Sequence, residues 1–250
     1  MSLLLHGDCL ELMKGLDSDS IDFIFCDLPY GQTSCKWDCC IDLDKFWIEV
    51  MRIKKINTPI FFTTTTKFGV DLINSAPKKC PFRYDLVWLK SAPAGFLSAK
   101  KMPMRKHEMV YVFYEKLPFY DLSSHQHKFL KPDSVVKEVD NNNKEEQIYD
   151  KQYLEKKIDF KGRKGEPRYD PPLPTSMLEI KSTRGKHSTE KPVALMEWLL
   201  KYYSKEGDVV LDPTMGSGST GVACKNMNRN FIGFELDAEI YEIAVNRIND

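Results

Sequence analysis

The sequence predicts an α/β protein built around a largely parallel sheet. Short runs of β-branched and aromatic residues alternate with longer stretches of helical periodicity. A glycine-rich turn stands between one such run and a helix near the end of the chain. The length of 250 residues is enough for one substantial core with a small satellite region.

Seven runs have the composition and length of strands, and turn residues bound them. They are Leu3–His6, Ile21–Cys26, Thr58–Thr63, Tyr84–Lys90, Glu108–Tyr114, Val209–Asp212 and Phe231–Glu235. Six stretches are expected to form helices: Cys9–Lys14, Asp42–Ile56, Phe68–Ser75, Val193–Tyr203, Ser219–Asn226 and Ala238–Asn249. The strand-helix alternation predicts a mostly parallel, seven-stranded sheet.

One region breaks this alternation. Residues 116–183 are polar and rich in Lys, Asp and Pro, and include the tract NNNKEEQ at 141–147. Insertions of this length are usually functional or mobile. We therefore expect two halves of one domain, residues 1–115 and 184–250, separated by an inserted region at 116–183.

Composition limits the class of protein. The formal net charge is zero, but residues 151–191 carry an excess of five positive charges. No stretch approaches the ~20 apolar residues of a membrane span, and the start of the chain does not resemble a secretory signal. We expect an intracellular, soluble protein. The seven cysteines are irregularly spaced, which favours reduced thiols over a metal site, although Cys35, Cys39 and Cys40 are clustered.

The glycine-rich turn begins after the run Val209–Asp212. It contains Gly216, Gly218 and Gly221 in GxGxxG spacing, and Glu235 follows 19 residues after Gly216 at the end of the next strand. Glycines allow a ligand to approach the backbone, and an acidic side chain can accept hydrogen bonds from ribose hydroxyls. This pattern suits NAD, FAD or S-adenosylmethionine equally, because all contain adenosine.

The place of this turn in the chain is informative. Only 15 residues follow Glu235, so the remaining strands of the sheet must come from the N-terminal part. The sequence therefore predicts a circularly permuted sheet. Dehydrogenases normally place this turn at the start of the nucleotide domain, which weakens the interpretation as an NAD-dependent oxidoreductase.

A second motif, Asp27-Leu28-Pro29-Tyr30, ends an apolar strand. In open α/β sheets ligands bind beyond the carboxyl ends of strands. A carboxylate and a backbone carbonyl at Leu28 or Pro29 can accept hydrogen bonds from an exocyclic amine and stabilise the charge that grows during its methylation. The ring of Tyr30 offers a stacking surface for a base turned out of a duplex.

Together, DLPYG, HSTEKPVAL and DPTMGSGSTG resemble the permuted β class of amino-group DNA methyltransferases, which modify adenine N6 or cytosine N4. The resemblance covers most of the chain. It implies a Rossmann-like methyltransferase fold, S-adenosylmethionine as cofactor and Asp27–Tyr30 as the catalytic signature, with Leu28 where the family usually has proline. It implies cofactor contacts from Asp8, His187, Thr189, Lys191, Asp212, Pro213, Thr214, Gly216, Ser217, Gly218 and Glu235. The segment Arg105–Glu108 is similar to a family element before a strand.

The resemblance further implies transfer of a methyl group to adenine N6 in double-stranded DNA, as in site-specific restriction-modification enzymes. The inserted region is then expected to recognise the target. The cations expected to contact phosphates are Lys161, Arg163, Lys164, Lys181, Arg184 and Lys186. No metal is expected. A homodimer is suggested by analogy only.

Several alternatives stay open at this point. Cytosine N4 is the nearest one, and RNA or protein amino groups are more distant acceptors. An NAD-dependent oxidoreductase explains the glycine turn but not Asp27–Tyr30. A DNA-binding module without catalysis lacks support, since the signature is present. Asp8 could cap the helix that begins near Cys9 instead of contacting a cofactor, or do both.

Overall fold

The computed structural model describes residues 2–29, 41–128, 168–183 and 190–250. The chain divides into two compact units, one formed by Met1–Asp121 with Thr175–Asp250 and the other by Leu122–Pro174. No helix in the described ranges has the length and apolar character that a bilayer span requires.

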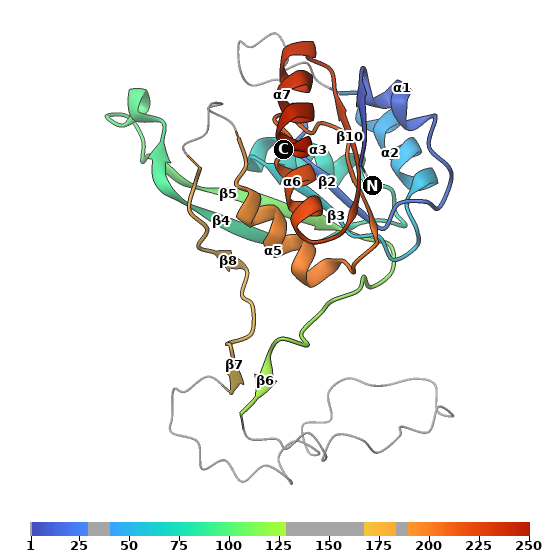
Figure 1. Cartoon of the computed structure of the whole chain (residues 1–250). Coiled ribbons are helices and arrows are strands. Elements are labelled where there is room, and N and C mark those ends of the chain that lie inside the picture. The colour runs from blue at the N-terminus through green and yellow to red at the C-terminus, as the bar shows by residue number, and fades with distance from the viewer. Residues whose placement is uncertain (1, 30–40, 129–167, 184–189) are drawn as a thin grey trace. The chain divides into compact units, whose positions relative to one another are not determined.

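The first unit is built on an eight-stranded sheet with the order β1-β10-β9-β2-β3-β5-β4-β8 (Figure 1). Its strands are β1 (Ser2–His6), β2 (Phe23–Cys26), β3 (Ile60–Thr64), β4 (Phe82–Ala94), β5 (Arg105–Phe113), β8 (Met177–Leu178), β9 (Val209–Asp212) and β10 (Asn230–Glu235). Only β5 runs antiparallel to its neighbours β3 and β4. All seven predicted strands are present, and the sheet is mostly parallel as expected.

The helices are α1 (Cys9–Met13), α2 (Leu43–Ile53), α3 (Thr66–Ser75), α5 (Val193–Tyr203), α6 (Ser219–Asn226) and α7 (Ala238–Asn249), with a short 3-10 helix η1 (Phe96–Ser98). All six predicted helices form. Side chains cap four of them: Asp8 accepts from the first turn of α1, Asp42 from α2, Thr65 from α3 and Asp237 from α7. The helix α2 ends at Ile53, three residues earlier than predicted.

The circular permutation is confirmed by the pairing of the first strand with the last. β1 lies parallel to β10 along its whole length, from the pair Ser2 and Phe231 to the pair His6 and Glu235. The strand β9, which precedes the glycine turn, pairs in turn with β2. The two ends of the chain therefore form one continuous sheet.

The core lies on both faces of the central strands. Every residue of β2 and β3 is buried, as expected for strands covered on two sides. Aromatic rings of Phe46, Trp47, Phe62 and Phe113 pack together under α2. In Figure 1, α5, α6 and α7 cover the opposite face from α2 and α3. This packing fixes the carboxyl ends of the parallel strands at one edge.

The inserted region is shorter than the sequence predicted. The second unit spans Leu122–Pro174, where β6 (Gln126–His127) pairs with β7 (Tyr169–Asp170). The segment that follows belongs to the sheet, because β8 pairs with β4 and adds an eighth strand. The indole of Trp88 also donates to the carbonyl of Ile180 at 2.8 Å. A two-residue strand has too few residues to show alternation, so the prediction placed it in the insertion.

Candidate active site

The two motifs singled out in the sequence meet at one edge of the sheet. Asp27 directly follows β2, and Asp212 ends the neighbouring strand β9. One pocket at this edge is lined by both motifs: Phe25, Asp27, Glu190, Lys191, Asp212, Thr214, Met215, Gly216, Ser217, Ser219, Thr220 and Ile240. The predicted juxtaposition of the signature with the glycine loop is therefore present in the fold, as far as the signature is described.

The carboxylate of Asp27 is held by groups from two other parts of the chain. The hydroxyl of Thr63, near the end of β3, donates to Oδ1. The ammonium of Lys191 lies 2.5 Å from Oδ2. Beside Asp27, the side chain of Leu28 is buried in the core and anchors the loop. The orientation of the carboxylate is consequently set by the protein before any ligand arrives.

Lys191 links Asp27 to a second carboxylate. Its Nζ lies 3.2 Å from Glu108 on β5, and Glu108 in turn pairs with Lys90 on β4 at 2.5 Å. Burial alone lowers the pKa of the Lys191 ammonium, but the charges of Asp27 and Glu108 outweigh burial and leave it raised. Lys191 is therefore charged at neutral pH, and the four side chains form an alternating row of charges. We call them the charge network.

The two glycines Gly216 and Gly218 of the loop have different surroundings. Gly216 has a positive φ of 53°, and a Cβ placed there would meet nothing within 4 Å. Gly218 has a φ of 82°, but its Cβ would lie 2.9 Å from Ile248 on α7. The backbone N–H of Gly216 donates to the carboxylate of Glu235 at 3.0 Å. Gly216 thus leaves room for a ligand, whereas Gly218 allows close packing of α7.

An ion pair that the sequence did not suggest connects three segments around this loop. Arg247 on α7 pairs with Glu190 at 2.7 Å. The same guanidinium donates to the carbonyl oxygen and to the hydroxyl of Ser217, at 3.2 and 3.0 Å. Glu190 precedes Lys191 directly and lines the pocket. The C-terminal helix therefore fixes the glycine loop against the segment that carries Lys191.

Asp212 is a buried carboxylate at the bottom of the pocket. It accepts hydrogen bonds from the Thr220 hydroxyl at 2.6 Å and the Thr214 backbone N–H at 3.2 Å. Burial raises the pKa of Asp212 to about 7, against the lowering effect of these hydrogen bonds, and the charges of Asp27 and Glu235 raise it further. Asp212 consequently titrates close to neutral pH.

This shift makes the folded state sensitive to pH. The pKa of Asp212 rises from 3.8 to about 7 on folding. The stability that protonated Asp212 contributes to the folded state is therefore fully present below pH 3.8 and is lost as the pH rises through about 7. We expect Asp212→Asn, which cannot ionise, to gain stability relative to the wild type across this window. The difference in melting temperature between the variant and the wild type should grow by several degrees as the pH rises through this window, since 1 kcal/mol corresponds to about 2–4 °C. A difference that stays constant across the pH range contradicts this assignment.

One buried polar atom of the pocket has no partner. Within the described residues, the Thr214 hydroxyl is the buried side-chain oxygen for which no hydrogen bond is found. Such atoms are rare in folded proteins and require an explanation. Because Thr214 lines the pocket beside Gly216, a bound ligand can supply the missing hydrogen bond.

Asp8 follows the end of β1, where the backbone N–H of Gly7 donates to the carbonyl of Glu235 at 2.9 Å, but it does not line the pocket. Its carboxylate accepts from the backbone N–H groups of Leu10 and Glu11 at 2.8 and 3.3 Å, so the capping alternative is confirmed. It lines a separate depression between α1 and α2, together with Lys14 and Lys45. The structure does not bring Asp8 to the pocket of Asp27.

The predicted site residues otherwise fall into two groups. The pocket is lined by Asp27, Lys191, Asp212, Thr214, Gly216 and Ser217. Pro213 is buried next to Asp212 in the chain, and the carboxylate of Glu235 accepts a hydrogen bond from the loop at Gly216. Tyr30, Lys161, Arg163, Lys164, Arg184, Lys186, His187 and Thr189 lie outside the described residues, as do Cys35, Cys39 and Cys40. Lys181 is exposed beyond β8.

Comparison with known proteins agrees with this architecture. The profile of the N6/N4 DNA methylase family matches residues 21–246. The type II methyltransferase M2.LlaDCHI of Lactococcus lactis subsp. cremoris is 24% identical over 273 residues, covering 99% of this chain and 89% of that protein. The DNA adenine methyltransferase YhdJ of Escherichia coli K12 is 24% identical over 261 residues, covering 98% and 82%.

A solved structure is similar over the whole length. The crystal structure of the M1.HpyAVI complex with S-adenosylmethionine superposes with a TM-score of 0.65, at 24% identity and with both chains fully covered. This likeness establishes the fold. Because the family profile spans most of the sequence and the signature and glycine loop line one pocket, the chain belongs to the N6/N4 DNA methylase family.

Proposed function

We propose that the protein transfers a methyl group from S-adenosylmethionine to the exocyclic N6 of adenine in double-stranded DNA, with the target base turned out of the duplex. One observation carries the proposal: Asp27 and Gly216 line the same pocket. The two groups that the reaction needs, an acceptor for the amine and a surface for the cofactor, are thereby within one site.

The residues of the pocket suit this cofactor. Gly216 leaves open space beside the backbone, and the Thr214 hydroxyl is buried without a partner. Apolar surface comes from Met215 and Ile240, and the Glu235 carboxylate lies beside Gly216. We assign Glu235 to the ribose hydroxyls and Thr214 and Gly216 to the cofactor's polar groups. When bound, S-adenosylmethionine supplies an electrophilic methyl group on a sulfonium sulfur.

The proposed role of Asp27 is to accept a hydrogen bond from the target amine. The lone pair of an aromatic amine is delocalised into the ring, which makes the nitrogen a poor nucleophile. A carboxylate acceptor at one N–H and a backbone carbonyl of Leu28 or Pro29 at the other favour a tetrahedral nitrogen and stabilise its growing positive charge. The new nitrogen–carbon bond forms as the carbon–sulfur bond breaks, and one amine proton is released.

In the described structure both oxygens of Asp27 already accept hydrogen bonds, from Thr63 and Lys191. Each carboxylate oxygen has two acceptor positions, so capacity for the amine remains. The family resemblance implies that Lys191 contacts the cofactor, and Lys191 lines the pocket. Its ion pair with Asp27 supports a positioning role at the catalytic carboxylate.

The glycine loop offers a test that separates ligand binding from folding. We expect Gly216→Ala to place a methyl group in the pocket and to raise the dissociation constant for S-adenosylmethionine about tenfold or more, with a stability loss of only about 1–2 kcal/mol. Gly218→Ala is expected to destabilise the fold further, because its methyl group meets Ile248. Calorimetric titration and thermal melting of both variants measure the two effects. Equal cofactor affinity in Gly216→Ala and the wild type would contradict the assignment of the loop.

Adenine is favoured over cytosine because the signature begins with aspartate, whereas serine is commoner in cytosine enzymes of the family. Cytosine N4 is the second candidate, since the acceptor chemistry is the same. Sequencing of methylated bases in DNA from cells that express the protein, beside cells that express Asp27→Ala, distinguishes them. N6-methyladenine that depends on Asp27 supports the proposal. N4-methylcytosine would replace it with the second candidate, and unmodified DNA would refute both.

Recognition of the target sequence is assigned to the inserted region and its flanks. Lys181 is exposed just after β8. We assign it to contact with DNA phosphates, together with the other cations for which the sequence predicts this role. Association of two copies is part of the same proposal.

A further inference from the structure

The strands β4 and β5 continue past the sheet as a projecting hairpin. The main ladder ends where Leu89 pairs with His107, and after an irregularity Ala94 pairs with Arg105. Between them the chain turns through Gly95, whose φ is 92°, and the short helix η1. We call residues 91–106 the hairpin arm. Figure 1 shows it leaving the end of β4 and β5, away from the helices.

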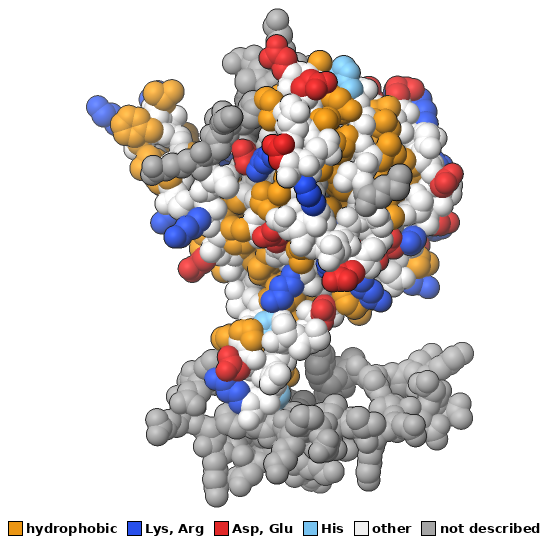
Figure 2. All heavy atoms as spheres, viewed as in Figure 1, with side chains coloured by type: hydrophobic (Ala, Val, Ile, Leu, Met, Phe, Trp, Pro, Cys, Tyr) orange, Lys and Arg blue, Asp and Glu red, His pale blue; other side chains and the backbone are white. Residues whose placement is uncertain are grey.

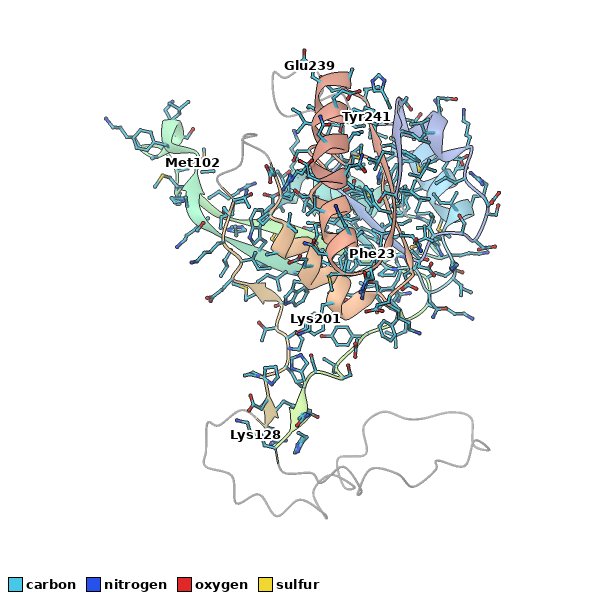
Figure 3. The ribbon with its side chains drawn as sticks, in the orientation of Figure 1. Phe23, Met102, Lys128, Lys201, Glu239 and Tyr241 are labelled. Atoms are coloured by element: carbon cyan, nitrogen blue, oxygen red, sulfur yellow. The ribbon has the colours of Figure 1, made fainter. Side chains whose placement is uncertain are left out.

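The end of the hairpin arm exposes large apolar side chains to solvent. Phe96 is 82% exposed and Leu97 100%, and Met102 and Met104 are 60% and 42% exposed. Figure 2 shows hydrophobic side chains gathered at the end of this projection, and Figure 3 shows Met102 among side chains that point outward. A contiguous apolar surface on a projecting element indicates an interaction site.

The same arm is strongly basic. Residues 90–107 contain Lys90, Lys100, Lys101, Arg105 and Lys106 and no acidic residue, although the whole chain has zero net charge. The four cations beyond Lys90 are exposed, and within the described ranges no carboxylate forms an ion pair with them. The arm therefore combines an apolar end with unpaired positive charge, which fits a polyanion that also offers apolar surface.

The arm begins at the active site. Lys90 and Glu108, at its base, belong to the charge network that holds Asp27 through Lys191. Because Thr64 at the carboxyl end of β3 pairs with Met109, the arm leaves the sheet from the edge that carries the pocket. Phe96 at the tip comes six positions after Lys90, and six residues of extended chain span about 20 Å. Duplex DNA of about six base pairs has that length.

The base of the arm is braced on one side. Ser91 and Ser182 exchange two hydrogen bonds, of 3.3 and 3.1 Å, beside the exposed Lys181. The segment that follows β8 thus contacts the base of the arm at Ser182. The arm is in this way held in a defined direction relative to the pocket.

We propose that the hairpin arm is a DNA-binding element. Its four outer cations contact backbone phosphates, and Phe96 and Leu97 enter a groove and pack against the bases beside the target. Apolar side chains of other DNA-binding proteins act as wedges that unstack a base step, and a two-stranded ribbon fits the major groove. The inference rests on the proposed function, because it presumes that the amine held at Asp27 belongs to duplex DNA.

The test compares two arm variants with matched controls. The tip variant is Phe96→Ser with Leu97→Ser, and the cation variant is Lys100→Gln, Lys101→Gln and Lys106→Gln. The controls are Ile48→Ser, an exposed apolar residue of α2, and Lys78→Gln with Lys79→Gln, exposed lysines before the opposite end of β4. Binding to a mixed-sequence duplex of about 30 base pairs, longer than the reach of the arm, is followed by fluorescence anisotropy across a salt titration.

We expect the cation variant to lose at least about tenfold in affinity at low salt and to reduce the slope of log affinity against log salt by nearly three, since each phosphate contact contributes about 0.9. The tip variant should lose about tenfold in affinity with an unchanged slope, and its KM for DNA should rise by a similar factor. Both variants should bind S-adenosylmethionine as the wild type does. Circular dichroism and melting temperature report whether each variant is folded, and Leu97→Ser alone replaces the tip variant if it is not.

Two results would overturn the inference. One is DNA affinity within about twofold of the matched controls for both arm variants. The other is a sedimentation coefficient of the arm variants that differs from that of the wild-type protein, which would assign the arm to contact between copies of the chain. Neither result affects the proposed function, which fails separately if a folded protein binds S-adenosylmethionine but neither binds nor methylates DNA.

Discussion

Replacing Asp27 with alanine is expected to lower kcat for DNA methylation by about 10²–10³-fold. The substitution removes the acceptor that stabilises positive charge on the amine, and loss of one such electrostatic group typically costs 10²–10³-fold. The mutation also leaves Lys191 without its 2.5 Å partner in the site. Methyl transfer from labelled S-adenosylmethionine to DNA measures the effect under single-turnover conditions.

A matched aspartate serves as control. Asp22 lies just before β2, at the opposite end of the same strand, and pairs with Lys55 at 2.7 Å. Asp22→Ala should cost some stability and leave kcat close to the wild-type value. Asp27→Ala should retain binding of S-adenosylmethionine, because the loop of Gly216 is supported independently by Glu235 and Met215. Comparable losses of kcat in the two aspartate variants would show that Asp27 has only a structural role.

Replacing Lys191 with methionine is expected to lower kcat about 10²-fold. Without the ammonium, Asp27 and Glu108 face each other as like charges, and Asp27 loses the contact that orients it. Removing one partner of a largely buried ion pair also destabilises the fold, so the melting temperature should fall by several degrees. Lys191→Arg keeps the charge but not the compact shape of an ammonium, and should recover part of the activity.

A second buried lysine separates positioning from stability. Lys54 is 2% exposed and pairs with Glu115 at 2.9 Å, far from the pocket residues in the sheet. Lys54→Met should lower the melting temperature as Lys191→Met does, with kcat of the folded protein unchanged. Since the raised pKa keeps Lys191 charged, the wild-type rate should show no ionisation of this group near neutral pH. Equal kcat in Lys191→Met and Lys54→Met would contradict the positioning role.

The fold was largely predictable because its elements carry strong local signals. The apolar runs of β2 and β3 are buried on both faces, and α2 repeats its buried residues at helical spacing from Phe46 to Ile53. The permuted order was visible in the sequence because the signature Asp27–Tyr30 precedes the glycine turn at Gly216. In contrast, β8 is two residues long and owes its existence to pairing with β4, a long-range interaction that leaves no pattern in the sequence.

Only those site residues that belong to a recognisable sequence motif could be predicted. Asp27 and Gly216 were identified from spacing and chemistry, whereas Thr63, Glu190 and Arg247 were not. Thr63 is one of four successive threonines and has no local mark of its own, and Arg247 lies on a helix with ordinary amphipathic character. Their roles depend on which strand ends and helices become neighbours in space. Lys191 was found, but its partner Asp27 is 164 residues away, and no local pattern encodes that contact.

The order of strands at one side of the sheet has a consequence for how the enzyme is made. The C-terminal pair β9 and β10 lies between two N-terminal strands, β1 and β2. A ribosome must therefore synthesise β10 before β1 gains this partner of the described sheet, and a nascent chain that ends before β9 lacks the glycine-loop residues that line the pocket. Cleavage within the second unit would yield two inert fragments, and restored methylation on mixing them would report their reassembly directly.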